Sequence, residues 1–235
     1  MEFPAPLTRA FFECREKRFF IHAHRSDGTP VIAHTNNTGT MRGCLFPGGE
    51  IFLSPAANPA RKLRWTLELA RTEPDGVLVG VNTVMANRLV REALENGVLD
   101  LLPAGGDLRA EVRYGEQGSR VDFLATGPDG ARTWIEVKNV SLVEDGHARF
   151  PDAPTVRGRK HLQELAAMVT AGDRAVLVFC IQREDATSVG PADDIDPAYG
   201  HLLRQVARQG VALHGLVCRA TPTAISPLAL VPVSI

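Results

Sequence analysis

The chain has 235 residues, of which 44% are hydrophobic and 23% charged, and its formal net charge is -1. This ordinary globular composition excludes a disordered chain and leaves room for one large domain or two small ones. A net charge so close to zero gives no overall electrostatic case for nucleic-acid binding, so any such surface must be local.

Several sequence features bear on cellular location. No apolar run approaches the roughly 20 residues that cross a bilayer, and the N-terminal MEFPAPLTRAFFE lacks the parts of a signal peptide. The four cysteines include no CxxC pair, which argues against a disulfide framework or a structural zinc site. We therefore expect a cytoplasmic protein with no membrane partner. The oligomeric state stays open, with a homodimer among the options.

Residues 7–83 contain short segments typical of strands, separated by Gly, Pro and Asn turns. The clearest segment alternates Leu63, Trp65, Leu67 and Leu69 with polar residues, which predicts a strand with one buried face. The other segments are RFFIHAHR, PVIAHT, TMRGCLF, EIFLS and GVLVGVN. Because closing a sheet removes the exposed edges of short strands, residues 1–83 are predicted to form an OB-like β-barrel.

The N-terminal part is modestly basic, with nine Lys and Arg residues against five Asp and Glu residues up to Trp65. Its candidate nucleic-acid contacts are Arg18, Arg25, Arg42 and Arg64. Phe19, Phe20 and Trp65 offer stacking surfaces, although a core position is the alternative for all three.

Residues 84–235 have a different pattern, in which helices alternate with strands. Asn82 or Thr83 can cap a helix that stops at Gly97, and LRAEVRYG, SRVDFLAT and RTWIEVKNV predict three antiparallel strands. A helix over 155–171, the strand RAVLVFCIQ, a helix capped by Asp196 and the strand GVALHGLVC follow. This order predicts a mixed α/β domain with helices covering a central sheet.

The candidate catalytic residues lie on two of these strands. Glu136 and Lys138 are two residues apart, so on a strand they share one face at about 7 Å, and Asp122 lies on the preceding strand. Asp122 and Glu136 are the oxygen ligands that Mg²⁺ or Mn²⁺ requires, and Lys138 can hold a water or stabilise a charged transition state. A surface strand with a cross-strand ion pair is the competing interpretation.

Further candidates flank this set. Glu111 can add a third carboxylate if its strand presents the same face, and a solvated position is the alternative. His161 lies one helical turn after Arg157, so both share a polar face that can look into the site. Arg157, Arg159 and Lys160 lie near a helix N-terminus, where phosphate contacts are favourable; a solvated charged face competes with this interpretation.

Several segments together are similar to the sugar fermentation stimulation protein A family, nearly end to end. They include AHTNNTGTMRGCLFPGG, EVRYGEQGSRVDF, WIEVKNVSL and FPDAPTVRGRKHLQEL. The resemblance implies an OB-like domain followed by a PD-(D/E)xK nuclease-like domain, with the nuclease motif on Asp122, Glu136 and Lys138. The motif's leading proline is replaced here by Val121.

The resemblance also implies DNA as the partner, while the sequence leaves RNA open. Two functions follow as expectations, and an RNA-processing or carbohydrate-related enzyme that reuses the same fold stays a third alternative. The first is a metal-dependent phosphodiesterase in which residues 84–235 cleave nucleic acid held partly by the barrel. The second is a non-catalytic DNA-binding regulator of sugar-metabolism genes that uses a nuclease-like scaffold.

Overall fold

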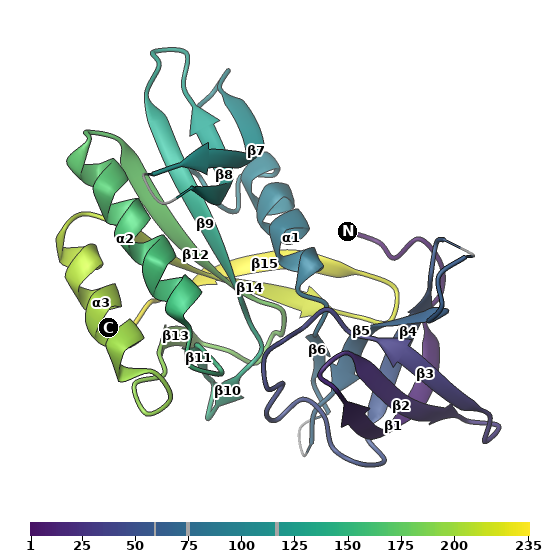
Figure 1. Ribbon diagram of the computed structural model, residues 1–235. Helices are drawn as coiled ribbons and strands as arrows, with labels where there is room; N and C mark the ends of the chain where they lie inside the picture. The colour runs from purple at the N-terminus through teal and green to yellow at the C-terminus, as the bar shows by residue number, and fades with distance from the viewer. Residues whose placement is uncertain (59, 74–75, 116–117) are drawn as a thin grey trace.

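The computed structural model describes residues 1–58, 60–73, 76–115 and 118–235. Six strands form the N-terminal sheet in the order β3-β2-β1-β4-β5-β6, and the pairing of β3 with β5 closes the first five into a barrel (Figure 1). Fully buried side chains such as Ile21, Leu53 and Leu67 fill its interior. The predicted OB-like barrel is therefore confirmed. Its strands are β1 (Thr8–Glu16), β2 (Phe20–Arg25), β3 (Pro30–His34), β4 (Glu50–Pro55), β5 (Trp65–Arg71) and β6 (Leu78–Gly80).

Strand β5 corrects the prediction that four alternating residues share one buried face. Phe52 pairs with Leu69 and Leu53 with Leu67, so Glu68 is an extra residue between two successive pairs. This bulge turns Leu67 into the barrel and Leu69 toward the second domain, where it joins a different core. A bulge changes which face later residues occupy, and alternation in the sequence does not reveal it.

The segment TMRGCLF, predicted as a strand, lies in turns and irregular structure instead. Met41 and Gly43 adopt positive φ angles of 52° and 74°, which no continuous strand accommodates. Met41 and Cys44 are nevertheless buried in the barrel core, so the apolar residues of this loop are used for packing.

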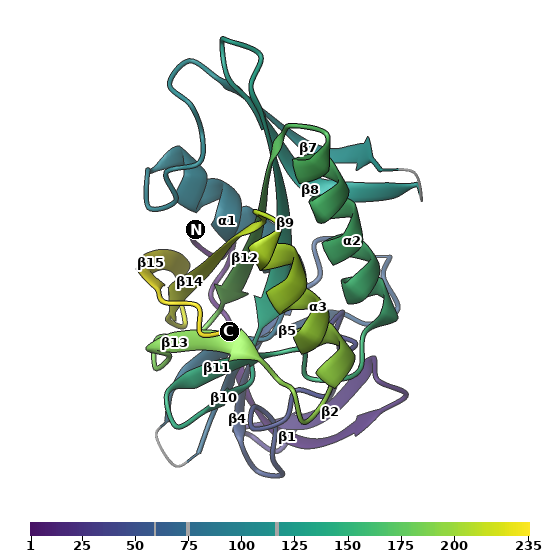
Figure 2. The same ribbon diagram turned by 90° about the vertical axis from the view of Figure 1, so that its left-hand side faces the viewer.

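The second domain is built on a sheet in the order β15-β14-β12-β9-β8-β7. Strands β9, β12 and β14 are parallel, while β7, β8 and β15 run antiparallel to their neighbours. Helix α1 covers one face and helices α2 and α3 cover the other (Figures 1 and 2). The bounds are α1 (Val84–Glu95), β7 (Asp107–Tyr114), β8 (Ser119–Thr126), β9 (Arg132–Val140), α2 (Val156–Thr170), β12 (Arg174–Ile181), α3 (Pro197–Arg208), β14 (Ala212–Ala220) and β15 (Ile225–Val231).

The predicted helices and the β7–β8–β9 meander are present where the sequence placed them. Thr155 caps α2 by accepting a hydrogen bond from the Gly158 amide, and Asp196 caps α3 through the Tyr199 amide. At α1 it is Asn82 whose side-chain oxygen accepts from the Val84 amide. Caps of this kind satisfy amides that have no partner within the helix.

Four strands escaped the sequence prediction. Strand β15 pairs with β14 and forms an edge of the sheet, so GVALHGLVC is not the last strand. A separate three-stranded sheet joins β10 (Val143–Glu144), β11 (His147–Phe150) and β13 (Ser188–Pro191). Strands as short as β10 have too few residues to show a period.

One hydrophobic cluster includes residues of both domains, in addition to the separate core inside the barrel. Phe52 and Leu69 of the barrel pack with Met85 of α1 and Ile135 of β9. The N-terminal segment also packs on the second domain, where the Met1 ammonium group donates to Glu92 at 2.9 Å. None of the helices in the described part of the chain is long and apolar enough to cross a membrane.

Candidate active site

The site begins where β8 and β9 separate. Their ladder ends at the pair Phe123 and Ile135, and Asp122 and Glu136 are the next residues on the two strands. The Asp122 carboxylate accepts a hydrogen bond from the Val137 amide at 2.7 Å, and its other oxygen accepts from the Asn87 side chain at 2.7 Å. The Val137 amide therefore bonds to the Asp122 side chain and not to the backbone of β8, and the two strands separate at this point.

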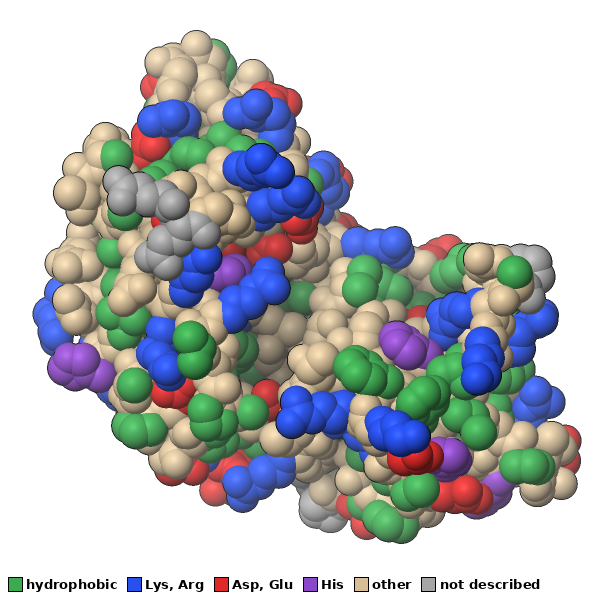
Figure 3. All heavy atoms as spheres, viewed as in Figure 1, with side chains coloured by type: hydrophobic (Ala, Val, Ile, Leu, Met, Phe, Trp, Pro, Cys, Tyr) green, Lys and Arg blue, Asp and Glu red, His purple; other side chains and the backbone are tan. Residues whose placement is uncertain are grey.

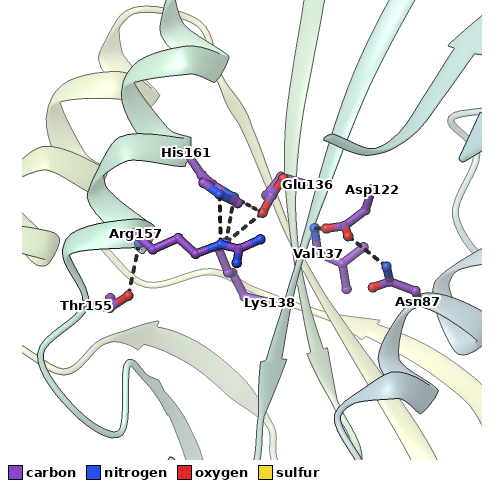
Figure 4. A network of polar contacts seen from close by, with 9 residues as sticks. Asn87, Asp122, Glu136, Val137, Lys138, Thr155, Arg157 and His161 are labelled. Carbon is purple, nitrogen blue, oxygen red and sulfur yellow. Dashed lines mark hydrogen bonds and ion pairs between the residues drawn. The ribbon is translucent and has the colours of Figure 1, made fainter. Parts of the chain in front are cut away.

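Glu136 and Lys138 share one face of β9, as their spacing predicted. Lys138 Nζ donates to Glu136 Oε1 at 2.7 Å, and His161 Nδ1 of α2 contacts the same oxygen (Figure 4). Glu136 is only 2% exposed, and its second oxygen, Oε2, is buried with no hydrogen-bond partner in the described part of the chain. Buried carboxylate oxygens normally have a partner, so an open one indicates a place for an ion or water.

His161 connects this pair to the start of α2. Arg157 Nε donates to His161 Nε2 at 3.3 Å, one turn earlier on the helix (Figure 4). With Nε2 as the acceptor, the ring proton lies on Nδ1 and is donated to Glu136. His161 is 5% exposed and lines a cavity together with Arg157 and Glu136, so this polar helical face looks into the site.

The protein shifts the pKa values of the two carboxyl groups in opposite directions. Burial, followed by the negative charge of Glu136, raises the pKa of Asp122 to about 6. Burial alone would raise the pKa of Glu136 too, but the Lys138 charge and the hydrogen bonds from His161 and Lys138 hold it below its usual range. Neighbouring acids whose pKa values are shifted apart in this way are typical of functional sites.

Asp122, Glu136 and Lys138 line one cavity of about 330 Å³, with Arg157 and Glu111 also in its wall. The carboxylates enter it from different sides, Asp122 next to α1 and Glu136 next to α2 (Figure 4). Lys and Arg side chains gather on this face of the second domain, beside the notch between the domains (Figure 3).

Glu111 lies opposite Asp122, between the pairs Ala110–Phe123 and Val112–Val121. Its φ is 55°, a left-handed conformation that costs a non-glycine residue about 1 kcal/mol or more. The distortion coincides with the cavity, where Glu111 is exposed.

These residues fit a hard divalent cation held by few protein ligands. No group of three or more His, Cys, Asp and Glu side chains surrounds one metal position within residues 1–58, 60–73, 76–115 and 118–235. Two carboxylates nevertheless match the donor set of Mg²⁺, which usually keeps several waters. One of them has an oxygen with no hydrogen-bond partner among the described residues. Asp122 and Glu136 would hold such an ion.

The three cations predicted at the start of α2 have different positions. Arg157 and Lys160 line an adjoining cavity of about 470 Å³ together with Arg120. Arg159 instead binds both oxygens of Asp196 at 2.9 and 2.8 Å, which ties α2 to the N-terminus of α3. Its guanidinium group is used for packing two helices together.

The four predicted barrel cations lie outside these cavities. Arg25 lies over the Trp65 ring at 5.1 Å, and Arg42 pairs with Glu144 of the second domain at 3.4 Å. Arg18 has a positive φ of 63° in the turn between β1 and β2, and Arg64 precedes β5. The structure therefore spreads them over the barrel and does not gather them at the Asp122 cavity.

Sequence reasoning missed three polar residues of this cavity, Asn87, Arg120 and Asn139, and the first two carried a signal. Arg120 lies two residues before Asp122 on β8, and Asn87 lies one helical turn after Thr83. Both spacings carried a signal, since residues at i and i+2 of a strand or i and i+4 of a helix share a face.

Family models and a solved structure match nearly the whole chain. The model described as "SfsA N-terminal OB domain" matches residues 14–81, and "Sugar fermentation stimulation protein RE domain" matches residues 84–224. A solved structure of SfsA from Pyrococcus furiosus in complex with Ca²⁺ has a TM-score of 0.88 at 28% identity, covering 100% of this chain and 98% of that one. The expected fold class is confirmed as an OB-like barrel followed by a mixed α/β domain.

Curated relatives agree over the full length. Sugar fermentation stimulation protein homologues from Geobacter metallireducens and Geobacter sulfurreducens are each 48% identical over 233 residues. The alignments cover 99% of this chain, with 99% and 98% of the respective relatives. The chain therefore belongs to the sugar fermentation stimulation protein family.

Proposed function

We propose that this protein is a divalent-metal-dependent phosphodiesterase that cleaves DNA. The observation that carries the proposal is the cavity where β8 and β9 part, lined together by Asp122, Glu136 and Lys138. Glu136 keeps one buried oxygen without a partner in the described part of the chain, next to a lysine held at 2.7 Å. A fully satisfied surface ion pair, the competing interpretation, would leave no such oxygen.

A divalent cation is the cofactor that suits this donor set, and we propose Mg²⁺ or Mn²⁺. Ca²⁺ in the related Pyrococcus furiosus protein supports a hard-cation site in the family. The bound ion would supply Lewis-acid stabilisation of charge on the phosphodiester. Asp122 and Glu136 would hold it, with Glu111 as a third carboxylate at the rim.

The other residues act on water and phosphate. Lys138 presents an ammonium group beside Glu136, where it can orient the attacking water and stabilise charge that develops on phosphorus. His161 and Arg157 position Glu136 through their hydrogen-bonded chain. Arg120 and Lys160, at the adjoining cavity, are suited to holding flanking phosphates.

We divide the roles at residues 83 and 84. Residues 84–235 carry the cleavage site, and the barrel of residues 1–83 holds part of the DNA. Arg18, Arg25, Arg42 and Arg64 are its candidate phosphate contacts. Trp65 is partly covered by Arg25 and serves packing more than stacking.

A second candidate function is a non-cleaving DNA-binding regulator. The exposed surface of the barrel favours it: Phe19 is 42% exposed and stacks on His34 at 6.3 Å, close to the geometry of an aromatic platform for bases. In that case binding needs no metal, and substitutions at Glu136 leave every property of the complex unchanged.

The decisive experiment incubates purified protein with labelled single-stranded, duplex and branched DNA and with RNA, in Mg²⁺, Mn²⁺ or EDTA. We expect metal-dependent cleavage that falls by about 1,000-fold in Glu136→Gln and Lys138→Ala. The matched control is Glu184→Gln, because Glu184 pairs with Arg219 away from the cavity. Intact substrates in both metals, together with retained binding, would overturn the proposal in favour of the regulator.

A further inference from the structure

A second and larger cavity adjoins the proposed cleavage site. It measures about 660 Å³ and lies between α1 and strands β7 and β8. Four residues, Thr83, Asn87, Glu111 and Asp122, line both cavities. A group lying against Asp122 in the first cavity is therefore directly next to the opening of the second. Its volume falls in the range of about 300–1,000 Å³ that is typical of small-molecule sites.

The residues that line this cavity are suited to binding flat, partly apolar groups. Arg91 lies over the Phe123 ring at 5.4 Å, and its side chain is 41% exposed, so the cavity meets a planar guanidinium backed by an aromatic ring. Val84, 55% exposed, and Ala110 add apolar surface. Stacking on arginine or aromatic planes is how proteins hold unpaired bases.

The position of the cavity beside the proposed cleavage site indicates which kind of flat group it binds. Asp122, Phe123 and Arg91 line the same cavity, so a nucleotide whose phosphate lies near Asp122 can place its base against Arg91. Bases of an intact duplex are stacked and paired, and cannot enter a side cavity unless they are extruded. The occupant must therefore come from an unpaired or easily unpaired position.

We propose that this cavity, defined by Val84, Arg91, Ala110 and Phe123, binds an unpaired DNA base next to the scissile phosphate. The inference rests on the proposed function and deepens it by naming the substrate class, which is DNA with a single-stranded, bulged or mismatched nucleotide at the cut. Fully paired DNA would bind through its phosphates alone.

The test compares affinities in EDTA, so that cleavage plays no part. The ligands are a duplex with one bulged nucleotide, the same duplex with an abasic residue in the bulge, and the fully paired duplex. The wild type is expected to bind the bulged duplex about 10-fold more tightly than the other two, as one stacked base would give.

Val84→Trp fills the cavity mouth and should reduce this preference to about 2-fold or less while leaving affinity for paired DNA unchanged. Val156→Trp is the matched control, since Val156 is also the first residue of a helix, is 74% exposed and lines none of the cavities described above. Arg91→Ala removes the stacking plane and provides a second variant if Val84→Trp folds poorly.

The outcomes separate this inference from the proposed function. Equal affinity of the wild type for bulged and abasic duplexes overturns the base site even if the protein cleaves DNA. A preference that is lost in Val84→Trp and Arg91→Ala but kept in Val156→Trp supports the base site even if no metal produces cleavage. Absence of binding to all three duplexes overturns the base site, and the cleavage assay in Mg²⁺ or Mn²⁺ decides the proposed function separately.

Discussion

Each domain buries one glutamate on a central strand, and the two are used differently. Glu68 of β5 is 5% exposed and Glu136 of β9 is 2% exposed. Both Glu68 oxygens accept hydrogen bonds from neutral groups, Ser54 at 2.6 Å and Asn82 at 2.8 Å. Glu136 contacts Lys138 and His161 through one oxygen and leaves the other without a partner among the described residues.

The environments shift their pKa values in opposite directions. Burial raises the pKa of Glu68, whereas at Glu136 the Lys138 charge and the hydrogen bonds from His161 and Lys138 outweigh burial and lower it. A buried carboxyl with complete neutral partners stabilises a fold, here by joining β5 to Asn82, whose side chain caps α1. A buried carboxylate that stays charged next to an open cavity is available for chemistry.

The strongest test of this contrast exchanges each acid for its amide. Glu136→Gln should lower metal-dependent cleavage by about 1,000-fold, because a neutral amide neither holds a cation nor keeps Lys138 in place. Glu68→Gln should change cleavage by less than about 3-fold, since Glu68 lines none of the described cavities. Comparable losses in initial rate for both variants would contradict the contrast.

The free energy of unfolding, in contrast to cleavage, should depend strongly on Glu68. Glu68→Ala leaves Ser54 and the buried Asn82 side chain without their acceptor, and we expect it to lower the free energy of unfolding by about 2–4 kcal/mol. Urea denaturation measures this change. Glu184→Ala, which removes only an exposed ion pair, should cost less than about 1 kcal/mol. A Glu68 variant as stable as this control would show that the buried network is not structural.

A third prediction uses pH. Because the folded protein raises the pKa of Asp122 from 3.8 to about 6, it binds a proton more tightly than the unfolded chain does. Stability should therefore fall as pH rises between about 4 and 6, and the penalty is complete above that window. Asp122→Asn removes the penalty and should be more stable by on the order of 1–2 kcal/mol at about pH 8 in EDTA, but not at about pH 4.

Added Mg²⁺ or Ca²⁺ should raise the melting temperature of the wild type at about pH 8 but not that of Asp122→Asn, because the cation needs the ionised carboxylate. The same cation should have less effect on the wild type at about pH 5. Equal metal stabilisation of both proteins would exclude Asp122 as a ligand.

The smallest expected effect concerns the barrel. Arg42→Ala removes a 3.4 Å ion pair with Glu144 in which the arginine is 64% exposed, so stability should change by less than about 0.5 kcal/mol. If Arg42 contacts a phosphate, the salt dependence of DNA binding should lose about one unit of slope. An unchanged slope between about 50 and 200 mM salt would remove Arg42 from the DNA-binding surface.

Much of the fold was predictable because its signals are local. The caps at Thr155 and Asp196 and the alternation along β9 specify helices and a strand within a few residues. Other features were wrong or absent for identifiable reasons. The bulge at Glu68 reverses the side on which Leu69 lies, and strand β15 depends on pairing with β14.

The sequence by itself determined the three helices, most of the longer strands and the shared face of Glu136 and Lys138, because these follow from backbone periods of 2 and 3.6 residues. Only the tertiary structure decided that β8 and β9 part at Asp122, that His161 reaches Glu136 from α2, and that α1 encloses a second cavity. These contacts join residues 15 or more positions apart, and packing of the whole sheet, not local spacing, brings them together.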